Sequence, residues 1–154
     1  MSRKKVKVQH AIFECSPYSN NKTFVRFFLD QIQSPAFISL TPKQRLLYFY
    51  MKLQFCQKNS AKPEGKPEQF YFNRALYKER FHLYSNDAQF RRDRDALIQH
   101  GFITCRENGA ITRSKSIYAF SDEWQRYGTK DFHLSAKDKT LSLLHLENQE
   151  HLKH

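Results

Sequence analysis

The chain has 154 residues, a length that fits one domain with short appendages rather than two domains. Its 26 Lys and Arg exceed its 15 Asp and Glu, and the resulting net charge of +11 favours a polyanionic partner, with nucleic acid ahead of a membrane surface. No window approaches the roughly 20 apolar residues of a membrane-spanning helix, and the start MSRKKVKVQH lacks the apolar core of a signal peptide. These features predict a cytoplasmic protein without membrane contact.

Residues 1–22 are predicted to form a basic N-terminal arm, because Arg3, Lys4, Lys5 and Lys7 precede any strong core signal. The sequence that follows, KTFVRFFLDQ, is apolar and rich in aromatic and β-branched residues. This composition predicts a short strand that leads into a helical turn at SPAFISL.

A helix is predicted over residues 41–57, with the best start signal in the chain. Thr41 can cap it, Pro42 suits the first helical position, and Gln44 can complete a capping box. Its apolar stripe contains Leu46, Leu47, Tyr50 and Leu53. The Lys-, Pro-, Gly- and Glu-rich stretch QKNSAKPEGKPEQ that follows is expected to be an exposed loop.

A brief strand at residues 70–72 precedes two more predicted helices, over residues 73–80 and 86–99. Asn86 is a good N-cap for the second of these helices, with Gln89 three residues on to complete a capping box. Two short helices separated by about five residues form a helix-turn-helix candidate.

After Gly101, which is free to take the left-handed conformation that ends a helix, the periodicity becomes strand-like. FITCR and SIYAF predict the strands of a β-hairpin with an Asn-Gly turn signal, and SDEWQRYG predicts a short helix capped by Ser121. This order is that of a winged helix, an α+β fold in which a three-helix core carries a small antiparallel sheet and a β-hairpin wing. We expect this domain over residues 23–130.

A winged helix places its third helix in the major groove of DNA. With Phe90 and Leu97 pointing inward, Asp95 is expected on the outer face, and the first turn is best placed to meet base edges. The DNA-binding candidates on this helix are Asn86, Gln89, Arg91 and Arg92. We expect the last three to read bases, since Arg pairs with guanine and Gln with adenine. The alternative is a solvated helix face, and the carboxylates of Asp93 and Asp95 would repel phosphate.

The wing and the second helix supply further cations. The DNA-binding candidates of the wing are Arg106, Asn108, Arg113 and Lys115, and those of the second helix are Lys78 and Arg80. They are expected to contact phosphates, which position a protein on DNA without reading its sequence. The alternative for the wing is a solubilising loop.

No recognisable catalytic arrangement occurs in the chain: there is no P-loop, no carboxylate pair beside a histidine, and no Ser or Cys nucleophile beside a base. Cys15, Cys56 and Cys105 lie far apart, which predicts reduced, partly buried thiols. The histidines are isolated or lie in a polar tail. We therefore expect no enzyme activity, metal, cofactor or small-molecule substrate.

Three segments carry a resemblance to a known family: FFLDQIQSPAFISLTPKQRLLYFYM, RRDRDALIQHGFI and SIYAFSDEWQRYG. Together they resemble the winged-helix proteins of bacterial plasmids, phages and integrative or conjugative elements, which include replication-initiation and relaxosome accessory modules. The resemblance spans residues 24–128 and implies a DNA-binding winged helix. The chain departs from the family at the turn before the third helix, where FHLYS replaces a Gly-containing turn, so this turn must adopt another conformation.

Residues 131–154 are predicted to be a helical or flexible C-terminal segment that starts at Ser135. Its apolar strip contains Leu141, Leu143, Leu144, Leu146 and Leu152. This strip could pack on the core or pair with a second copy. We expect a homodimer, which would suit a palindromic DNA site.

The sequence thus predicts a sequence-specific double-stranded DNA-binding protein of a mobile genetic element, associated with nucleoid or plasmid, that acts in plasmid replication, DNA transfer or transcription control. One alternative is a winged-helix adaptor that mediates protein–protein interaction in a nucleoprotein complex. Another is a protein that binds RNA or single-stranded DNA, for which Tyr71 or Tyr84 would stack on bases from the basic surface.

Overall fold

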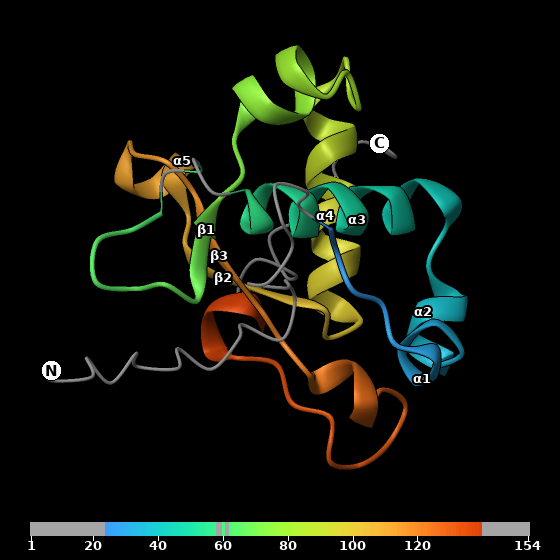
Figure 1. Ribbon diagram of the computed structural model, residues 1–154. Helices are drawn as coiled ribbons and strands as arrows, with labels where there is room; N and C mark the ends of the chain where they lie inside the picture. Colours follow the sequence, from blue (N-terminus) through green and yellow to red (C-terminus); the bar gives the residue numbers. More distant parts are fainter. Residues whose placement is uncertain (1–23, 58–59, 61, 140–154) are drawn as a thin grey trace, which may run out of the picture.

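The protein is described here by a computed structural model that covers residues 24–57, 60 and 62–139, and Figure 1 shows it as an α+β fold. The elements in chain order are α1 (Leu29–Ile32), α2 (Pro35–Ser39), α3 (Pro42–Cys56), β1 (Gln69–Tyr71), the π-helix η1 (Ala75–Arg80), α4 (Asp87–Gln99), β2 (Ile103–Glu107), α5 (Gly109–Thr112), β3 (Ile117–Phe120) and the 3₁₀-helix η2 (Glu123–Arg126). The expected α+β class is therefore confirmed.

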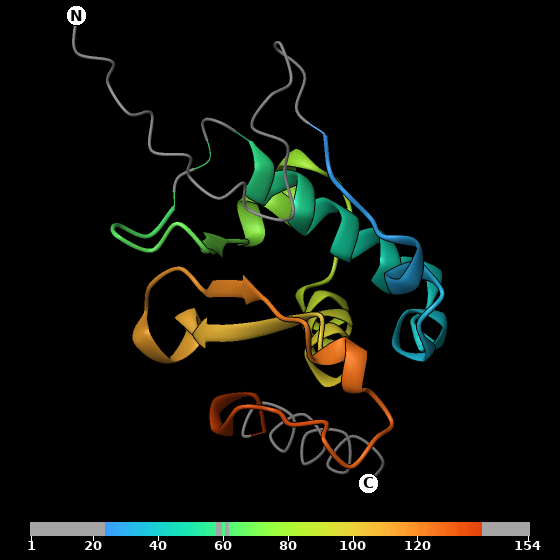
Figure 2. The same ribbon diagram turned by 60° about the horizontal axis from the view of Figure 1, so that its bottom comes forward.

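The three strands form one antiparallel sheet in the order β1-β3-β2. Tyr118 on the central strand lies opposite Phe70 on one side and Cys105 on the other. Strand β1 precedes α4 in sequence, yet it joins the edge of a sheet whose other strands follow α4. In Figure 2 the sheet lies between α3 and the segment that ends at residue 139.

Aromatic side chains fill the core, as the sequence predicts. Phe102 lies at its centre, 5.0 Å from the ring of Tyr48 and 6.2 Å from that of Trp124. Phe90 of α4 stacks on Tyr77 of η1 at 3.8 Å. Since each fully buried side chain of this size contributes roughly 1.5–3 kcal/mol, these rings account for much of the stability that holds α4 in place.

The predicted helix ends are largely confirmed. Thr41 and Gln44 form the capping box of α3, with the Thr41 N–H donating to Gln44 Oε1 at 2.9 Å. Asn86 caps α4 by accepting from the Ala88 N–H at 2.7 Å. Gly101 has φ +79°, a backbone conformation that favours glycine. A Cβ there would also lie 2.5 Å from the Trp124 backbone nitrogen, so both the conformation and the space require glycine.

Two predicted strand features are wrong. Residues 24–28 form no strand beyond an isolated bridge at Val25, and the chain turns into α1 directly afterwards. The Asn-Gly pair does not form a two-residue hairpin turn, because Asn108 instead caps the one-turn helix α5. A side chain oxygen that accepts from the backbone two residues on stabilises a helical start here. The hairpin itself, β2 with β3, is confirmed.

The cysteine prediction is only partly right. Cys105 is free and buried, whereas Cys56 is disulfide-bonded rather than reduced. No helix in the described part of the chain is long and apolar enough to cross a membrane.

The C-terminal segment is described only at its start. Ser135 caps a helical turn over residues 136–139, as expected, by accepting from the Asp138 N–H at 3.1 Å. The leucine strip beyond it, the cations of residues 3–7 and Cys15 lie outside the described residues.

Candidate nucleic-acid interface

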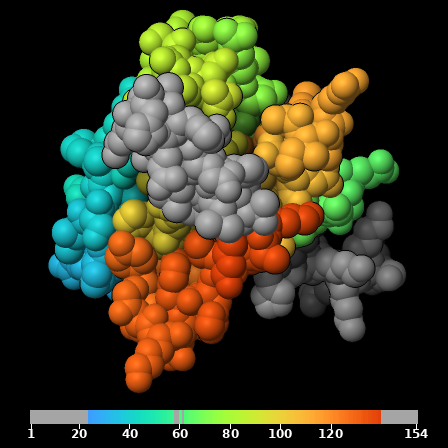
Figure 3. All heavy atoms as spheres, turned by 180° about the vertical axis from the view of Figure 1, so that it is seen from behind, coloured from blue at the N-terminus to red at the C-terminus, as the bar shows by residue number. Residues whose placement is uncertain are grey.

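The start of α4, η1 and the β2–β3 connection (residues 108–116) lie toward one end of the molecule. Helix α4 runs away from this end and β2 returns toward it, so that the connection comes back to the level at which α4 begins (Figure 1). Seen from behind, η1 and the connection form separate projections at this end (Figure 3). The elements that carry the predicted site residues therefore lie toward the same end of the molecule, with the connection apart from α4 and η1.

Helix α4 offers an exposed surface only along its first two turns. Arg91 and Arg92 are exposed there, whereas Phe90, Leu97 and Ile98 are buried against the core. The side-chain oxygen of Asn86 is committed to capping the helix, which leaves its NH₂ group for a ligand.

Gln89 and Arg92 are joined by a hydrogen bond, in which the Arg92 guanidinium donates to Gln89 Oε1 at 2.9 Å. The other end of the Gln89 side chain, Nε2, lies 3.4 Å from both carboxylate oxygens of Asp93. Gln89 therefore does not complete a capping box with Asn86, because its amide is engaged along the helix instead.

Asp93 and Asp95 of α4 are buried, so Asp95 does not lie on the exposed face on which it was expected. Asp93 and Asp95 are only 3% and 5% exposed. Asp95 forms a buried ion pair with Arg94 at 2.8 Å, and Arg94 also interacts with the hydroxyl of Tyr118. Both carboxylates are therefore buried away from direct contact with a phosphate, and that of Asp95 is paired with Arg94.

Asp93 is the centre of a buried polar cluster. It accepts from the Tyr84 hydroxyl at 2.7 Å and from Gln44 Nε2 at 3.4 Å, in addition to Gln89. Burial and this hydrogen bond raise the pKa of Tyr84 well above its ordinary value, so the phenol remains a donor. Tyr84 is buried and is therefore not a base-stacking residue.

Lys43 fixes the turn before α4. Its Nζ donates to the Leu83 carbonyl and lies 4.8 Å from the ring of Tyr84. His82 in the same turn has φ +50°, so a non-glycine residue takes the left-handed conformation and the chain turns here without a glycine. Sequence reasoning missed these contacts, because Lys43 lies 40 residues before Leu83 and Gln44 lies 49 residues before Asp93.

The β2–β3 connection is a tight turn with exposed cations. A Cβ on Gly109 would lie 2.2 Å from the Ser114 carbonyl oxygen, so only glycine lets the two arms of the turn approach. Asn108 accepts from the Ala110 N–H at 3.1 Å, and Arg113 takes the left-handed conformation at the end of α5. The side chain of Arg113 is exposed on this tight turn.

Lys115 and Arg106 flank this turn. Lys115 Nζ lies 5.4 Å from the centre of the Tyr71 ring, a cation–π contact that links the connection to β1. Arg106 occupies the irregular position of β2, between Cys105 and Glu107, where one extra residue interrupts the pairing with β3. Its side chain is exposed, while its carbonyl accepts from Lys137 Nζ at 3.1 Å.

The η1 cations are less free than those of the connection. Arg80 donates to Gln57 Oε1 at 2.7 Å, and Lys78 is half-buried. Burial and a hydrogen bond to Asp87 raise the pKa of Tyr77 to about 12, so this phenol donates to the first residue of α4. Tyr77 thereby ties η1 to the start of α4.

The predicted site residues thus fall into two groups. Gln89 and Arg92 are in contact with each other, and Lys115 is held against β1, whereas the exposed side chains of Arg91 and Arg113 extend from separate elements. Across the described residues, no three His, Cys, Asp or Glu side chains gather in a way that could hold a metal ion.

No protein-family model, no curated protein and no solved structure matches this chain. Its function has to be inferred from its own residues.

Proposed function

We propose that this protein is a non-enzymatic winged-helix protein that binds double-stranded DNA sequence-specifically. Helix α4 would be the recognition helix and the β2–β3 hairpin the wing. The observation that carries the proposal is that exposed cations of η1, α4 and the wing lie toward one end of a molecule whose sheet has the order β1-β3-β2. Helix, sheet order and charge are the features that such a protein needs to place a helix in the major groove.

In this proposal the cations of α4 meet base edges, and those of the wing and η1 contact the DNA backbone. Arg91 and Arg92 lie on the exposed first turns of α4, where base edges are within reach. The wing cations Arg106, Arg113 and Lys115 contact phosphates, which adds affinity for any duplex. Lys78 and Arg80 of η1, with the Asn86 amide, add contacts to the backbone beside the groove.

The resemblance in the sequence supports a role in a mobile genetic element, where the protein would act on plasmid or nucleoid DNA in replication, transfer or transcription control. Selection of bound duplexes from a random pool tests sequence specificity directly. A recovered motif supports the proposal, and recovery of no preferred sequence opposes it.

Fluorescence anisotropy with a labelled duplex tests the wing. Arg113→Ala or Lys115→Ala should weaken binding to every sequence and lower the slope of log K against log salt by about 1. Lys130→Ala, which removes the same charge from an exposed position after η2, is the matched control and should have little effect. Failure of the unaltered protein to bind any duplex at low salt would remove the proposal.

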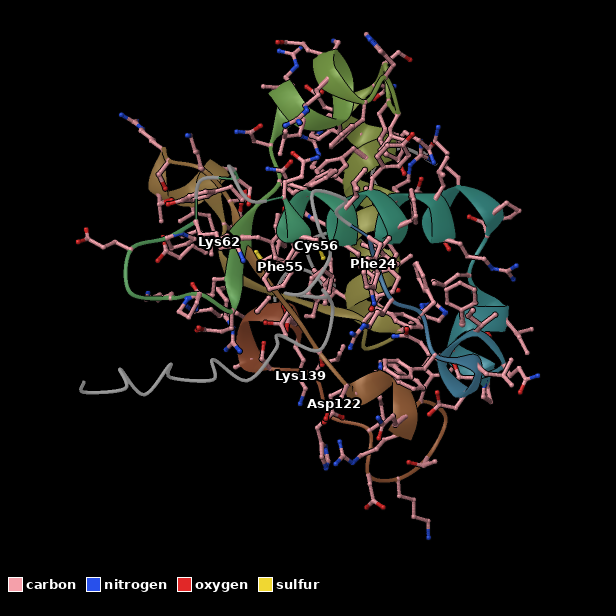
Figure 4. The ribbon with its side chains drawn as sticks, viewed as in Figure 1. Phe24, Phe55, Cys56, Lys62, Asp122 and Lys139 are labelled. Atoms are coloured by element: carbon pink, nitrogen blue, oxygen red, sulfur yellow. The ribbon has the colours of Figure 1, made fainter. Side chains whose placement is uncertain are left out.

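The second candidate function is that of an adaptor that binds protein, and an exposed apolar face favours it. This apolar face consists of Phe28, Leu29, Ile32, Ile38, Leu46 and Phe49, which belong to α1, α2, α3 and the residue before α1. Leu29 and Ile38 are 70% and 62% exposed. Figure 4 shows Phe24, a further exposed ring, beside α3. Large exposed apolar side chains on consecutive elements favour a contact with protein.

We infer that a second copy of the chain occupies the apolar face. Copies that each carry a net charge of +11 repel one another. Residues 24–41 contain only Arg26 and Asp30 as charged residues, and these balance, so two copies can meet over this stretch with little charge repulsion. Arg45 beside this stretch donates to the carbonyls of Phe37 and Ile38, and its charge is thereby directed to the end of α2.

Sedimentation velocity tests this dimer. The protein should sediment as a dimer at tens of micromolar, and the double variant Leu29→Ser, Ile38→Ser should be monomeric. Ile111→Ser is the matched control, since Ile111 is as exposed but lies at the tip of the wing. A monomer for the unaltered protein would exclude the dimer and leave duplex binding unaffected.

A further inference from the structure

The contacts of Asp93 define how the first turns of α4 are held. As a carboxylate Asp93 can only accept hydrogen bonds, and it receives them from Tyr84, Gln44 and Gln89. Tyr84 belongs to the turn before α4 and Gln44 to the first turn of α3. Since Gln44 also forms the capping box of α3, the position of Asp93 is linked to two other parts of the core.

The direction of the Gln89 amide follows from Asp93. An acceptor on the buried side attracts the NH₂ end of the amide, so Nε2 is turned toward Asp93 and Oε1 away from it. Oε1 then accepts from Arg92. A glutamine reads adenine by presenting its donor and its acceptor together to the base edge. In Gln89 both groups are already engaged along the helix, so it is not available for this pairing.

Arg92, unlike Gln89, keeps hydrogen-bond donors that can meet a base edge. Its guanidinium has five N–H donors, and the contact with Gln89 uses one of its terminal nitrogens, which leaves further donors directed at solvent. The side chain is exposed on the helix surface expected to meet the groove. A guanidinium that is already held in one orientation loses less conformational entropy when it pairs with a base.

We propose that Arg92 reads a guanine through its O6 and N7 atoms, and that Gln89 and Asp93 are positioning residues that orient Arg92 rather than base readers. This inference rests on the proposed duplex binding and adds the identity of one base in the target. It replaces the expectation that Gln89 reads adenine. Asp93 accepts from both Tyr84 and Gln89, and Gln89 in turn accepts from Arg92, so each contact orients the next side chain.

Arg91 provides an internal comparison. It is exposed on the neighbouring position of the same helix and carries the same charge. Arg92 differs from it by the hydrogen bond to Gln89. Arg91→Ala should therefore reduce affinity without removing the guanine preference, whereas Arg92→Ala should remove that preference.

The experiment uses the full chain and the duplex selected from a random pool, together with duplexes changed at one base pair at a time and an unrelated duplex. For the unaltered protein, replacing one guanine should weaken binding about 10- to 100-fold, as for a good bidentate pair. Arg92→Lys keeps the charge but lacks the planar fork, so binding to the unrelated duplex should persist while the preference at that guanine falls to about 2-fold or less.

Variants of the supporting residues test the positioning roles. Gln89→Met keeps the length of the side chain but removes both hydrogen bonds, and it should lower the same guanine preference several-fold. Tyr84→Phe removes a single hydrogen bond from Asp93 and should act in the same direction, more weakly. Asp93→Asn should resemble Gln89→Met. Because Asp93→Asn can impair folding, Tyr84→Phe carries the test if the melting temperature of Asp93→Asn falls strongly.

The outcomes separate this inference from the proposed function. If the unaltered protein binds no duplex at low salt, the proposed function fails. If it binds duplexes and Gln89→Met removes a preference for adenine, or Arg92→Lys keeps the guanine preference, the inference is wrong while duplex binding stands. Equal loss of binding to selected and unrelated duplexes in Gln89→Met also overturns the positioning role, because a merely structural residue would act on both alike.

Discussion

The start of α4 and the wing carry similar exposed arginines, but they are held in different ways. Arg92 is held by a side chain that is itself held by a buried carboxylate. Arg113 is held only through its backbone, at the left-handed end of α5. A side chain that is fixed by another side chain has a preferred direction, which suits base reading. A side chain that extends from a fixed backbone supplies charge over a wider region, which suits phosphate contact.

The two regions also differ in the contacts that hold their backbones in place. Helix α4 rests on buried charges, with Asp93 on one flank and the Arg94–Asp95 pair on the other. The wing rests on close backbone approach at Gly109. Loss of a buried charge partner should therefore affect the whole molecule, whereas damage at Gly109 should remain in the wing. The following changes test this contrast.

Asp95→Ala should have the largest effect. It leaves the guanidinium of Arg94 buried without its carboxylate partner, and breaking a buried pair in this way destabilises a protein by about 3–5 kcal/mol. Urea unfolding followed by circular dichroism measures the loss. Asp131→Ala is the matched control, because Asp131 is exposed and its removal should change the free energy of unfolding by less than about 0.5 kcal/mol. Similar values for both variants would contradict the role of the buried pair.

Gly109→Ala should have the next largest effect, and a more local one. The new Cβ would meet the Ser114 carbonyl oxygen and the Ser116 nitrogen, so the turn has to open, at a cost of about 1–3 kcal/mol. Displacement of Arg113 should weaken binding to all duplexes while the order of preferred sequences is kept. Ala110→Ser, at the exposed neighbouring position, is the control. A changed sequence preference in Gly109→Ala would show that the wing also reads bases.

Cys105 is a buried thiol in β2, the strand that leads from the core to the wing, and its titration tests the packing there. Burial raises the pKa of its thiol from 9.0 to about 11. Because the folded form holds the proton more tightly than the unfolded form, the associated stability is complete below pH 9 and is lost as the pH rises to about 11. Urea unfolding between pH 8 and pH 11 should show this decline, and Cys105→Ala should reduce it. An identical pH profile for both proteins would contradict the assignment.

Local patterns in the sequence predict the elements of both regions well. The capping residues Thr41 and Asn86 and the helix-ending Gly101 lie where expected, because caps depend on residues within one turn. The hairpin turn predicted at the Asn-Gly pair is wrong for a related reason. Its turn signal is shared by hairpins and helix starts, and the close approach of Ser114 to Gly109, which decides between them, cannot be seen in the local pattern.

The polar cluster of α4 could not be predicted in the same way. Helical periodicity gives only the angular positions of Asp93 and Asp95 around the helix axis. A charged residue is then expected to be exposed to solvent unless a buried partner is known. The partners are Tyr84, which lies in a turn, and Gln44, which lies 49 residues away from Asp93. Such contacts exist only once α3 and α4 are packed. The candidate base-reading residues were therefore found by position, but the role of Gln89 became visible only from its contacts.

The smallest expected effect compares the same substitution in both regions. Asn86 and Asn108 cap helices with the same hydrogen bond, to the N–H two residues on. Asn86→Ala should lower the free energy of unfolding by about 1 kcal/mol, because α4 is part of the cooperative core. Asn108→Ala should lower it by less than about 0.5 kcal/mol and instead speed amide exchange over residues 110–113, because α5 can open by itself. Equal losses of stability would mean that the wing unfolds together with α4, and that the two regions form one cooperative unit.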